Sequence, residues 1–262
     1  MKAFRLIPVL LLALLPALRA ELKLPAVIGD HMVLQRRQAN PIWGWDTPGA
    51  KVTVKFAGQT HSATAGADGR WSVKLAALEA NATPQSLEIA GSSRRELKDI
   101  LVGEVWMCSG QSNMQWSLSQ AYNGDIEALA SSFPNLRIIS VPQVGTQDLQ
   151  NDFKGQWEAA TPDSVKSFSA VGFLYGRYLH EILKVPVGLI DNAWGGSAAE
   201  AWVRRESLEK DPRFAALMKS TVDREAQLKG DQPRLDHEAA IDRKSTRLNS
   251  SHVSESRMPS SA

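Results

Sequence analysis

The sequence predicts an α/β fold, with a parallel sheet flanked by helices and a small all-β sandwich-like domain in front of it. Short segments with alternating polar and apolar residues fill residues 21–98, as in small antiparallel sheets. From residue 99 onward, apolar strand-like runs alternate with amphipathic helical patterns, which is typical of parallel sheets. The composition, 43% hydrophobic and 22% charged, is that of a globular protein that buries a core.

The first part of the chain shows the two-residue period of β-strands. Residues 52–56 and 71–75 alternate strictly, and residues 87–89 continue the pattern. Turn-forming residues separate these segments, and Asp68-Gly69 predicts a hairpin because glycine adopts positive φ without steric cost. Short strands at this spacing predict a small sandwich.

The second part of the chain combines strands and helices. Residues 100–108 form an apolar run that predicts a mostly buried strand, and residues 137–141 and 185–190 predict two more. Between the last two strands, residues 171–183 repeat apolar side chains at the spacing of one helix face. Residues 200–217 predict a further helix.

The amino terminus has the pattern of a secretory signal peptide. Lys2 and Arg5 precede the apolar run of residues 6–18, and Ala20 is a small residue suited to cleavage. The run is shorter than the roughly 20 residues of a membrane-spanning helix, so cleavage is favoured over a membrane anchor. We therefore expect residues 1–20 to be removed and the mature protein to be secreted or periplasmic, without membrane association.

The last segment, residues 244–262, is rich in serine and lacks apolar periodicity. Such a composition buries too little apolar surface to offset the entropy cost of ordering, so we expect disorder. We interpret this segment as a non-native tail, and a natural disordered tail is the alternative.

Charge and residue usage exclude several function classes. A net charge of +2 argues against a nucleic-acid binder, which would usually carry a basic face. The single cysteine, Cys108, rules out an internal disulfide, and we interpret it as a small buried side chain. Motifs for metal, phosphate or dinucleotide binding are absent from the sequence, so no metal or cofactor is expected.

Ser112 is the candidate nucleophile. It follows the apolar strand, at the sheet edge where ligands of α/β proteins bind, and Gly110 allows a sharp turn before it. Backbone N–H groups at a following helix start would face a developing oxyanion. Met114 stands where the α/β-hydrolase elbow has its second glycine, so that motif does not apply, and an ordinary loop serine remains an alternative.

The segment from Gly103 to Met114 strongly resembles the nucleophile block of sialate O-acetylesterases, a family of the SGNH hydrolase superfamily. Further stretches resemble the same family in the same order: residues 29–36, 41–45, 168–173, 185–190, 194–197 and 200–202. The resemblance extends from about residue 22 to about residue 215. It implies an SGNH-hydrolase-like sheet whose N-terminal part is residues 99–243, behind the β-domain of residues 21–98.

This resemblance also implies roles for individual residues. Ser112 would attack an acetyl carbonyl, and its own backbone N–H together with Gly195 and Gly196 would form the oxyanion hole. The polar neighbours with an expected auxiliary or substrate-contacting role are Gln111, Asn113 and Asn192. For Asn113 and Asn192, a turn-forming role is an equal alternative.

The catalytic base of the family is missing from the sequence. The family supplies a histidine from an Asp-x-x-His or Asp-x-His-Pro element, and a Gln-Gly-Glu stretch before it, and neither pattern occurs here. Asp236-His237 is the nearest imitation, and Asp30-His31 and the helical His180 are not expected to serve. Because serine needs a base within reach, we expect a C-terminally truncated chain with weak activity at best.

The sequence thus favours a carbohydrate O-acetylesterase that hydrolyses acetyl esters of sialic acids or related glycans. Deacetylation of acetylxylan or another polysaccharide is a close alternative within the same chemistry. A secreted protein that binds glycans without catalysis is the alternative outside it. In each case the expected partner is an acetylated glycan or sialic acid.

Overall fold

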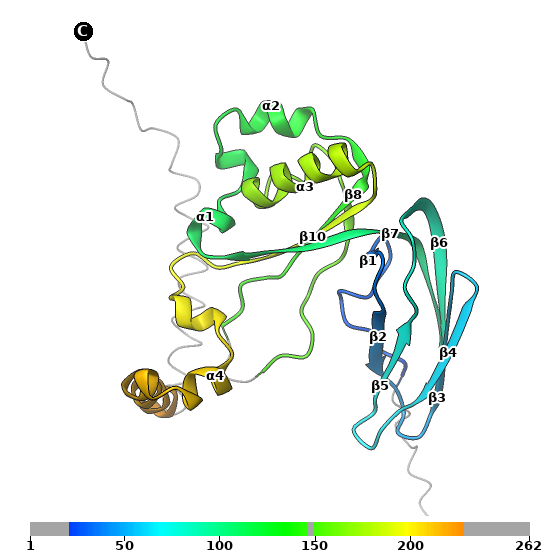
Figure 1. Cartoon of the computed structure of the whole chain (residues 1–262), viewed down its shortest axis with the longest axis horizontal. Coiled ribbons are helices and arrows are strands. Elements are labelled where there is room, and N and C mark those ends of the chain that lie inside the picture. Colours follow the sequence, from blue (N-terminus) through cyan, green and yellow to red (C-terminus); the bar gives the residue numbers. More distant parts are fainter. Residues whose placement is uncertain (1–20, 146–148, 228–262) are drawn as a thin grey trace, which may run out of the picture. The chain divides into compact units, whose positions relative to one another are not determined.

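A computed structural model describes residues 21–145 and 149–227 (Figure 1). The predicted signal peptide, residues 1–20, and the predicted tail, residues 244–262, lie outside the described residues. The chain divides after Ser197 into two compact units. No helix among the described residues is long and apolar enough to cross a membrane.

The first part of the chain is all β, as its alternating pattern predicts. Strands β2 (Asn40–Trp45) and β5 (Arg70–Leu75) form a two-stranded antiparallel sheet. Strands β3 (Lys51–Phe56), β4 (Gln59–Thr64) and β6 (Asn81–Ala90) pair antiparallel in the order β4-β3-β6 at one end of an eight-stranded sheet.

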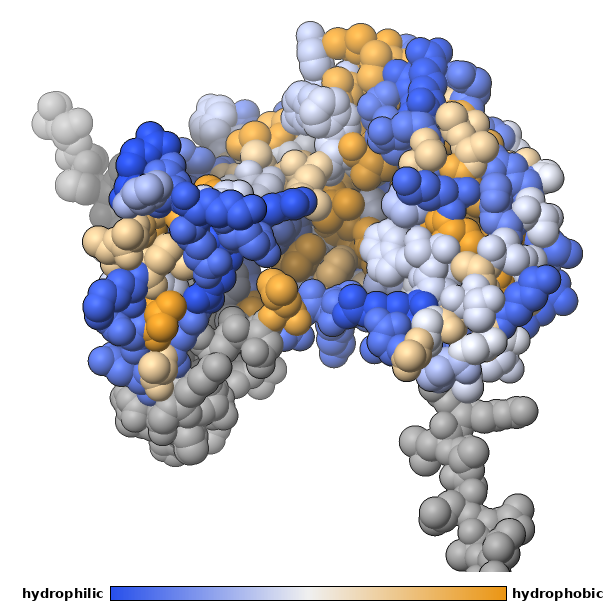
Figure 2. Space-filling model, turned by 60° about the horizontal axis from the view of Figure 1, so that its bottom comes forward, coloured by the Kyte–Doolittle hydropathy of each residue, from blue (hydrophilic) through white to orange (hydrophobic). Residues whose placement is uncertain are grey.

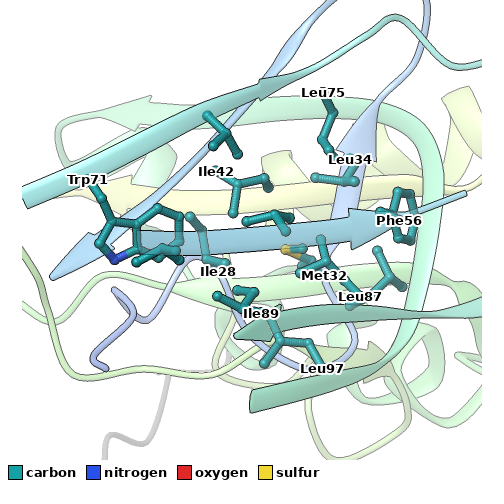
Figure 3. Close-up of a cluster of buried hydrophobic side chains, with 14 of the residues drawn as sticks. Ile28, Met32, Leu34, Ile42, Phe56, Trp71, Leu75, Leu87, Ile89 and Leu97 are labelled. Carbon is teal, nitrogen blue, oxygen red and sulfur yellow. The ribbon is translucent and has the colours of Figure 1, made fainter. Parts of the chain in front are cut away.

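Side chains from both sheets meet in one hydrophobic core (Figure 3). Ile42 and Leu75 come from the two-stranded sheet, and Phe56 and Ile89 come from the larger sheet. Each of these four side chains is at most 2% exposed. Apolar and polar residues therefore alternate along these strands because their side chains point alternately to the core and to solvent. This first part of the chain has the predicted sandwich-like arrangement.

The hairpin predicted at Asp68-Gly69 does not form. A turn is present, with Gly69 at a φ of +76°, but it joins β4 to β5, which belong to different sheets. The hairpin of this region lies at Ala57-Gly58, between β3 and β4, where both residues have positive φ. Turn residues determine where the chain reverses, whereas the pairing of the flanking strands depends on which core they cover.

The second part of the eight-stranded sheet is its parallel core. Strand β7 (Arg94–Gly110) pairs with β10 (Val187–Ala193), which pairs with β8 (Phe133–Ser140), and all three are parallel. Strand β1 (Val33–Gln35) also pairs parallel with β7, and β9 (Glu158–Ala160) closes the order antiparallel to β8. The prediction of a parallel sheet is confirmed for these strands, within a sheet that is mixed as a whole.

Strand β7 crosses the domain boundary that the sequence suggested at residues 98–99. Its first part pairs with β6 and β1, and its second part pairs with β10 from Glu104 to Gly110. Gly103 lies at the change of partners, where a Cβ atom would overlap the carbonyl oxygen of Pro186. One continuous strand therefore links the sandwich-like part to the parallel core.

The second half of β7 is more exposed than predicted. Ile100, Leu101 and Val102 are buried, but Trp106 is 42% and Met107 is 61% exposed. Among the described residues, this half of the strand pairs only with β10, so one edge is uncovered. On the face of the molecule seen in Figure 2, orange hydrophobic residues lie between blue hydrophilic ones.

Helices pack on the parallel core. α3 (Ala170–Leu183) contacts β10 and β8, and it lies on the same side of them as α2 (Gly124–Leu129) in Figure 1. α3 is the amphipathic helix that the sequence predicts, and Phe173 is fully buried on its inner face. The Ser169 hydroxyl caps the helix start by accepting a hydrogen bond from the backbone N–H of Gly172 at 3.0 Å.

In the second unit, the single helix predicted for residues 200–217 is broken into pieces. The pieces are η2 (Ala199–Trp202), α4 (Arg205–Lys210) and η3 (Pro212–Phe214), followed by helical residues 215–227. Proline lacks a backbone N–H and its ring clashes with the preceding turn, so Pro212 ends α4 and starts the next piece.

Candidate active site

Ser112 lies at the carboxyl end of β7, as the first residue of the short helix α1 (Ser112–Gln115). Before it, Gly110 has a φ of +144°, which side chains rarely tolerate, and this lets the chain leave the sheet abruptly. The backbone N–H of Trp194 donates to the Gly110 carbonyl at 2.8 Å, which holds the ends of β7 and β10 together. Ser112 is exposed at this edge, where a substrate can reach it.

Gln111 contacts the candidate nucleophile directly. The Ser112 hydroxyl donates to the Gln111 side-chain oxygen Oε1 at 3.3 Å, a long hydrogen bond. Gln111 and Asn113 are both exposed beside Ser112. Of the three auxiliary residues suggested by the sequence, Gln111 is the one that the structure places in contact with the hydroxyl.

Gly195 is brought next to Ser112, although 83 positions separate the two in sequence. A Cβ atom on Gly195 would lie 3.5 Å from both Cα and Cβ of Ser112. The backbone N–H of Gly195 donates to the side-chain oxygen Oε1 of Gln115, at the end of α1. Gly196 has a φ of +77°, and its Cβ position faces open space. Gly195 is therefore the glycine of this loop that lies against Ser112, while its N–H is bonded to Gln115.

Asn192 lies inside β10, opposite Ser109 of β7 in the parallel register. It is thus a strand residue and not the turn residue that the sequence allowed as an alternative. Its neighbour Asp191 lies opposite Cys108 of β7 in the same register.

Burial raises the pKa of Asp191 from its ordinary value of 3.8 to about 6. Backbone N–H groups of Ser169 and Ala193 act in the opposite direction, because they stabilise the charged carboxylate. The carboxyl oxygen Oδ1 of Asp191 is buried without a hydrogen-bond partner. Beside it, burial raises the pKa of Cys108 to about 11, with the Asp191 charge adding to the effect. Cys108 is 4% exposed, as expected of a structural cysteine.

The buried Asp191 predicts a pH dependence of stability. Its folded pKa of about 6 exceeds its ordinary value of 3.8, so folding takes up a proton between these values. Its contribution to stability is therefore present at low pH and is lost as pH rises to about 6. Asparagine does not titrate, so Asp191→Asn should not lose this contribution as pH rises. We therefore expect the urea midpoint of Asp191→Asn to increase relative to that of the native protein between about pH 4 and 7. A constant difference between the two midpoints would contradict the assignment.

Comparison with known proteins relates the chain to one group of enzymes. A scan against family models finds no match. Human sialate O-acetylesterase is 36% identical over 204 residues, which cover 70% of this chain and 39% of that protein. The rat sialate O-acetylesterase is 33% identical over 203 residues, covering 70% and 37%. By sequence, this chain is a relative of the sialate O-acetylesterases.

A solved structure agrees with this relationship. The crystal structure of a carbohydrate acetylesterase from Xanthomonas citri superposes with a TM-score of 0.69 at 38% sequence identity. The match covers 72% of this chain and 44% of that one. This sialate O-acetylesterase relative therefore shares the fold of a carbohydrate acetylesterase over most of its length. It spans about two fifths of the length of the curated relatives that it matches.

The described histidines of this sialate O-acetylesterase relative bond elsewhere than to Ser112. The Nδ1 atom of His31 lies 2.7 Å from the Asp99 carboxylate, and Nδ1 of His180 lies 2.7 Å from the Val185 carbonyl oxygen. His61 pairs with Gln59 at 3.0 Å.

The sequence contains two adjacent Asp-His pairs, Asp30-His31 and Asp236-His237. Asp30 accepts a hydrogen bond from the Lys98 backbone N–H, so Asp30 and His31 do not act on each other. Asp236-His237 lies outside the described residues. Among residues 21–145 and 149–227, no cluster of histidine, cysteine and acidic side chains could hold a metal ion.

Proposed function

We propose that the chain has the chemistry of a carbohydrate O-acetylesterase, with Ser112 as the nucleophile. The observation that carries this proposal is the placement of Gly195 against Ser112 at the carboxyl ends of two neighbouring parallel strands. A hydroxyl with a backbone N–H beside it is the arrangement that attacks an ester carbonyl and holds the resulting oxyanion. The named activities of the relatives supply the acetyl ester and the carbohydrate.

The proposed reaction begins when the Ser112 oxygen attacks the acetyl carbonyl carbon. The carbonyl oxygen becomes an oxyanion, which would accept hydrogen bonds from the backbone N–H groups of Ser112 and Gly195. In this structure the Gly195 N–H donates its hydrogen bond to the Gln115 side-chain oxygen, so the Gln115 side chain has to move before this N–H can bind the oxyanion. Collapse of the intermediate breaks the bond to the sugar oxygen, which takes up the proton that the Ser112 hydroxyl lost, and leaves acetyl-Ser112, which water then hydrolyses to acetate and free Ser112. No described histidine contacts Ser112. The base that accepts the proton of the Ser112 hydroxyl is therefore none of His31, His61 and His180.

The Gly195 backbone gives a direct prediction. An alanine side chain at this position would lie 2.6 Å from the Gln115 side-chain oxygen, which would have to move, and its methyl group would lie 3.5 Å from Ser112 Cβ, where it would crowd an acetyl group beside the hydroxyl. We expect Gly195→Ala to lower kcat for acetyl-ester hydrolysis by about a hundredfold, the scale of losing one oxyanion donor. Gly145→Ala is the control, because its new Cβ meets only an ordinary contact at 3.9 Å. An unchanged kcat in Gly195→Ala would remove Gly195 from the proposed oxyanion hole.

The substrate class is tested by acetate release. Purified protein is incubated with O-acetylated sialic acid and, separately, with acetylated xylan, beside the Ser112→Ala variant. Release from the sialic acid supports a sialate esterase, and release from xylan alone supports the polysaccharide deacetylase. If neither substrate releases acetate faster with native protein than with Ser112→Ala, the proposed activity is wrong.

A second candidate is a glycan-binding protein without catalysis. It is favoured by the bonding of the described histidines away from Ser112, which leaves the hydroxyl without a base among them. This candidate predicts saturable binding of a glycan in the absence of acetate release. The two measurements together separate it from the esterase.

We also propose that the protein is exported. The support is the sequence pattern of residues 1–20, in which Lys2 and Arg5 precede a short apolar run. Mass spectrometry of the protein made in a secreting host should find Glu21 as the first residue. An intact Met1 in the cytoplasmic fraction would contradict export.

A further inference from the structure

The β2–β5 sheet carries a groove that is separate from the Ser112 site. Its volume is about 460 Å³, within the range of about 300–1,000 Å³ typical of small-molecule sites. Its lining includes Trp43, Trp45, Thr64, Arg70, Ser72 and Asn151. None of them belongs to the elements that position Ser112 or Gly195.

Two tryptophans of the groove, Trp43 and Trp45, alternate with the buried residues of β2, and Trp43 also packs against the hydrophobic core. Ile42 and Gly44 face inward and are buried, whereas Trp43 and Trp45 alternate with them and remain partly exposed. Side chains two positions apart on a strand lie on one face, roughly 7 Å apart. Trp71 also lines the groove but is 3% exposed within the core, so we assign it no ligand contact.

Each of these two tryptophans has a polar cross-strand neighbour. In the antiparallel register Trp43 lies opposite Ser72, and Trp45 lies opposite Arg70. Directly opposite residues project from the same face of the sheet. The groove therefore places hydrogen-bonding groups beside aromatic rings.

Two further contacts fix the polar end of the groove. The Arg70 guanidinium donates to the Asn151 side-chain oxygen at 2.9 Å and lies 3.5 Å from the Asp68 carboxylate. The Lys23 ammonium lies 5.7 Å from the Trp45 ring centroid, in a cation–π contact that restrains the indole. The aromatic surface and its donors are thus held in place before any ligand binds, which reduces the entropy cost of binding.

We propose that this groove binds a glycan chain. A pyranose ring has an apolar face of C–H groups and a rim of hydroxyls, so it matches an indole face with hydrogen-bonding groups beside it. A purely apolar ligand would remove water from Arg70, Ser72 and Asn151 without offering them hydrogen bonds in return. The site gives the protein a hold on a glycan that does not depend on the Ser112 chemistry.

Isothermal titration calorimetry tests the proposal with two defined probes, xylohexaose and α2,8-linked oligosialic acid. The native protein and Ser112→Ala are both titrated, so binding is measured apart from turnover. We expect saturable binding of at least one probe, equal in the two proteins. Binding of xylohexaose identifies a neutral glycan as the ligand, and binding of oligosialic acid alone identifies an anionic one.

Variants locate the binding in the groove. Trp45→Ala is expected to weaken binding roughly three- to tenfold, the scale of one lost aromatic contact. Ser72→Glu adds a larger, charged side chain at the exposed position opposite Trp43 and should reduce binding below detection without touching the core. Trp106→Ala is the matched control, because Trp106 is 42% exposed but lies on β7 outside the groove.

The outcomes are decisive in either direction. Loss of binding in Ser72→Glu with retention in Trp106→Ala supports the proposal, even if Trp45→Ala fails to fold. The proposal is overturned if neither probe binds, or if Ser72→Glu binds as tightly as native protein. Because binding is scored without acetate release, an inactive esterase would leave this result unaffected.

Discussion

Replacing Ser112 with alanine is expected to reduce acetyl-ester hydrolysis to the rate measured without protein. Alanine lacks the Oγ atom, so covalent attack on the carbonyl is removed while the backbone N–H groups remain. In a complete serine triad the nucleophile is worth about 10⁶ in kcat. Because no described histidine contacts Ser112, we expect a lower starting rate and a loss of about a hundredfold or more. Release of 4-nitrophenol from its acetate ester measures both rates.

The control for this prediction lies three residues earlier. Ser109 is also exposed, at the end of β7, and Ser109→Ala should retain the native rate. The fold should survive the Ser112 change, since that hydroxyl is exposed and its hydrogen bond to Gln111 is long. Equal rates in native protein and Ser112→Ala would show that the observed hydrolysis does not use Ser112.

The second large effect is expected at Gly103. A Cβ atom there would overlap the backbone carbonyl oxygen of Pro186, which also accepts a hydrogen bond from the Glu104 N–H at 2.9 Å. Backbone atoms held in a sheet cannot move aside cheaply, so the strands must shift or the ladder must break. We expect Gly103→Ala to lower the free energy of unfolding by about 3 kcal/mol or more, at the upper end of overpacking effects. Urea denaturation measures the change.

Gly29→Ala provides the comparison for this stability effect. Its nearest neighbour would be the Ala26 carbonyl oxygen at 3.4 Å, an ordinary contact, so a change within about 0.5 kcal/mol is expected. If Gly103→Ala unfolds at the same urea concentration as Gly29→Ala, the close approach of β7 to Pro186 is not a constraint in solution.

Much of the fold follows from local patterns in the sequence. The alternation in residues 52–56 and 71–75 predicts β3 and β5, because a half-buried strand needs a period of two. The helical repeat in residues 171–183 predicts α3 within one residue. Strand β4 went unpredicted, since its residues are mostly polar and only its alternate exposure in the sheet reveals it.

Ser112 was recognisable because its signals are local: an apolar strand, a glycine and a serine in sequence. Gln115 was missed, because its role depends on accepting a hydrogen bond from Gly195, 80 positions away. The raised pKa of Asp191 could not be predicted for a similar reason, since it arises from burial in the folded protein. Long-range hydrogen bonds and burial of this kind leave no recognisable pattern in a short stretch of sequence.

The sequence by itself determined the strand and helix types, the serine at a strand end and the relationship to acetylesterases. These properties follow from residue periodicity, turn chemistry and motif order along the chain. Only the tertiary structure decided that β7 joins both parts of the sheet, that Asp68-Gly69 links two different sheets, and that Gly195 lies against Ser112. The physical reason is that strand pairing and close backbone approach depend on long-range packing, which local sequence preferences do not specify.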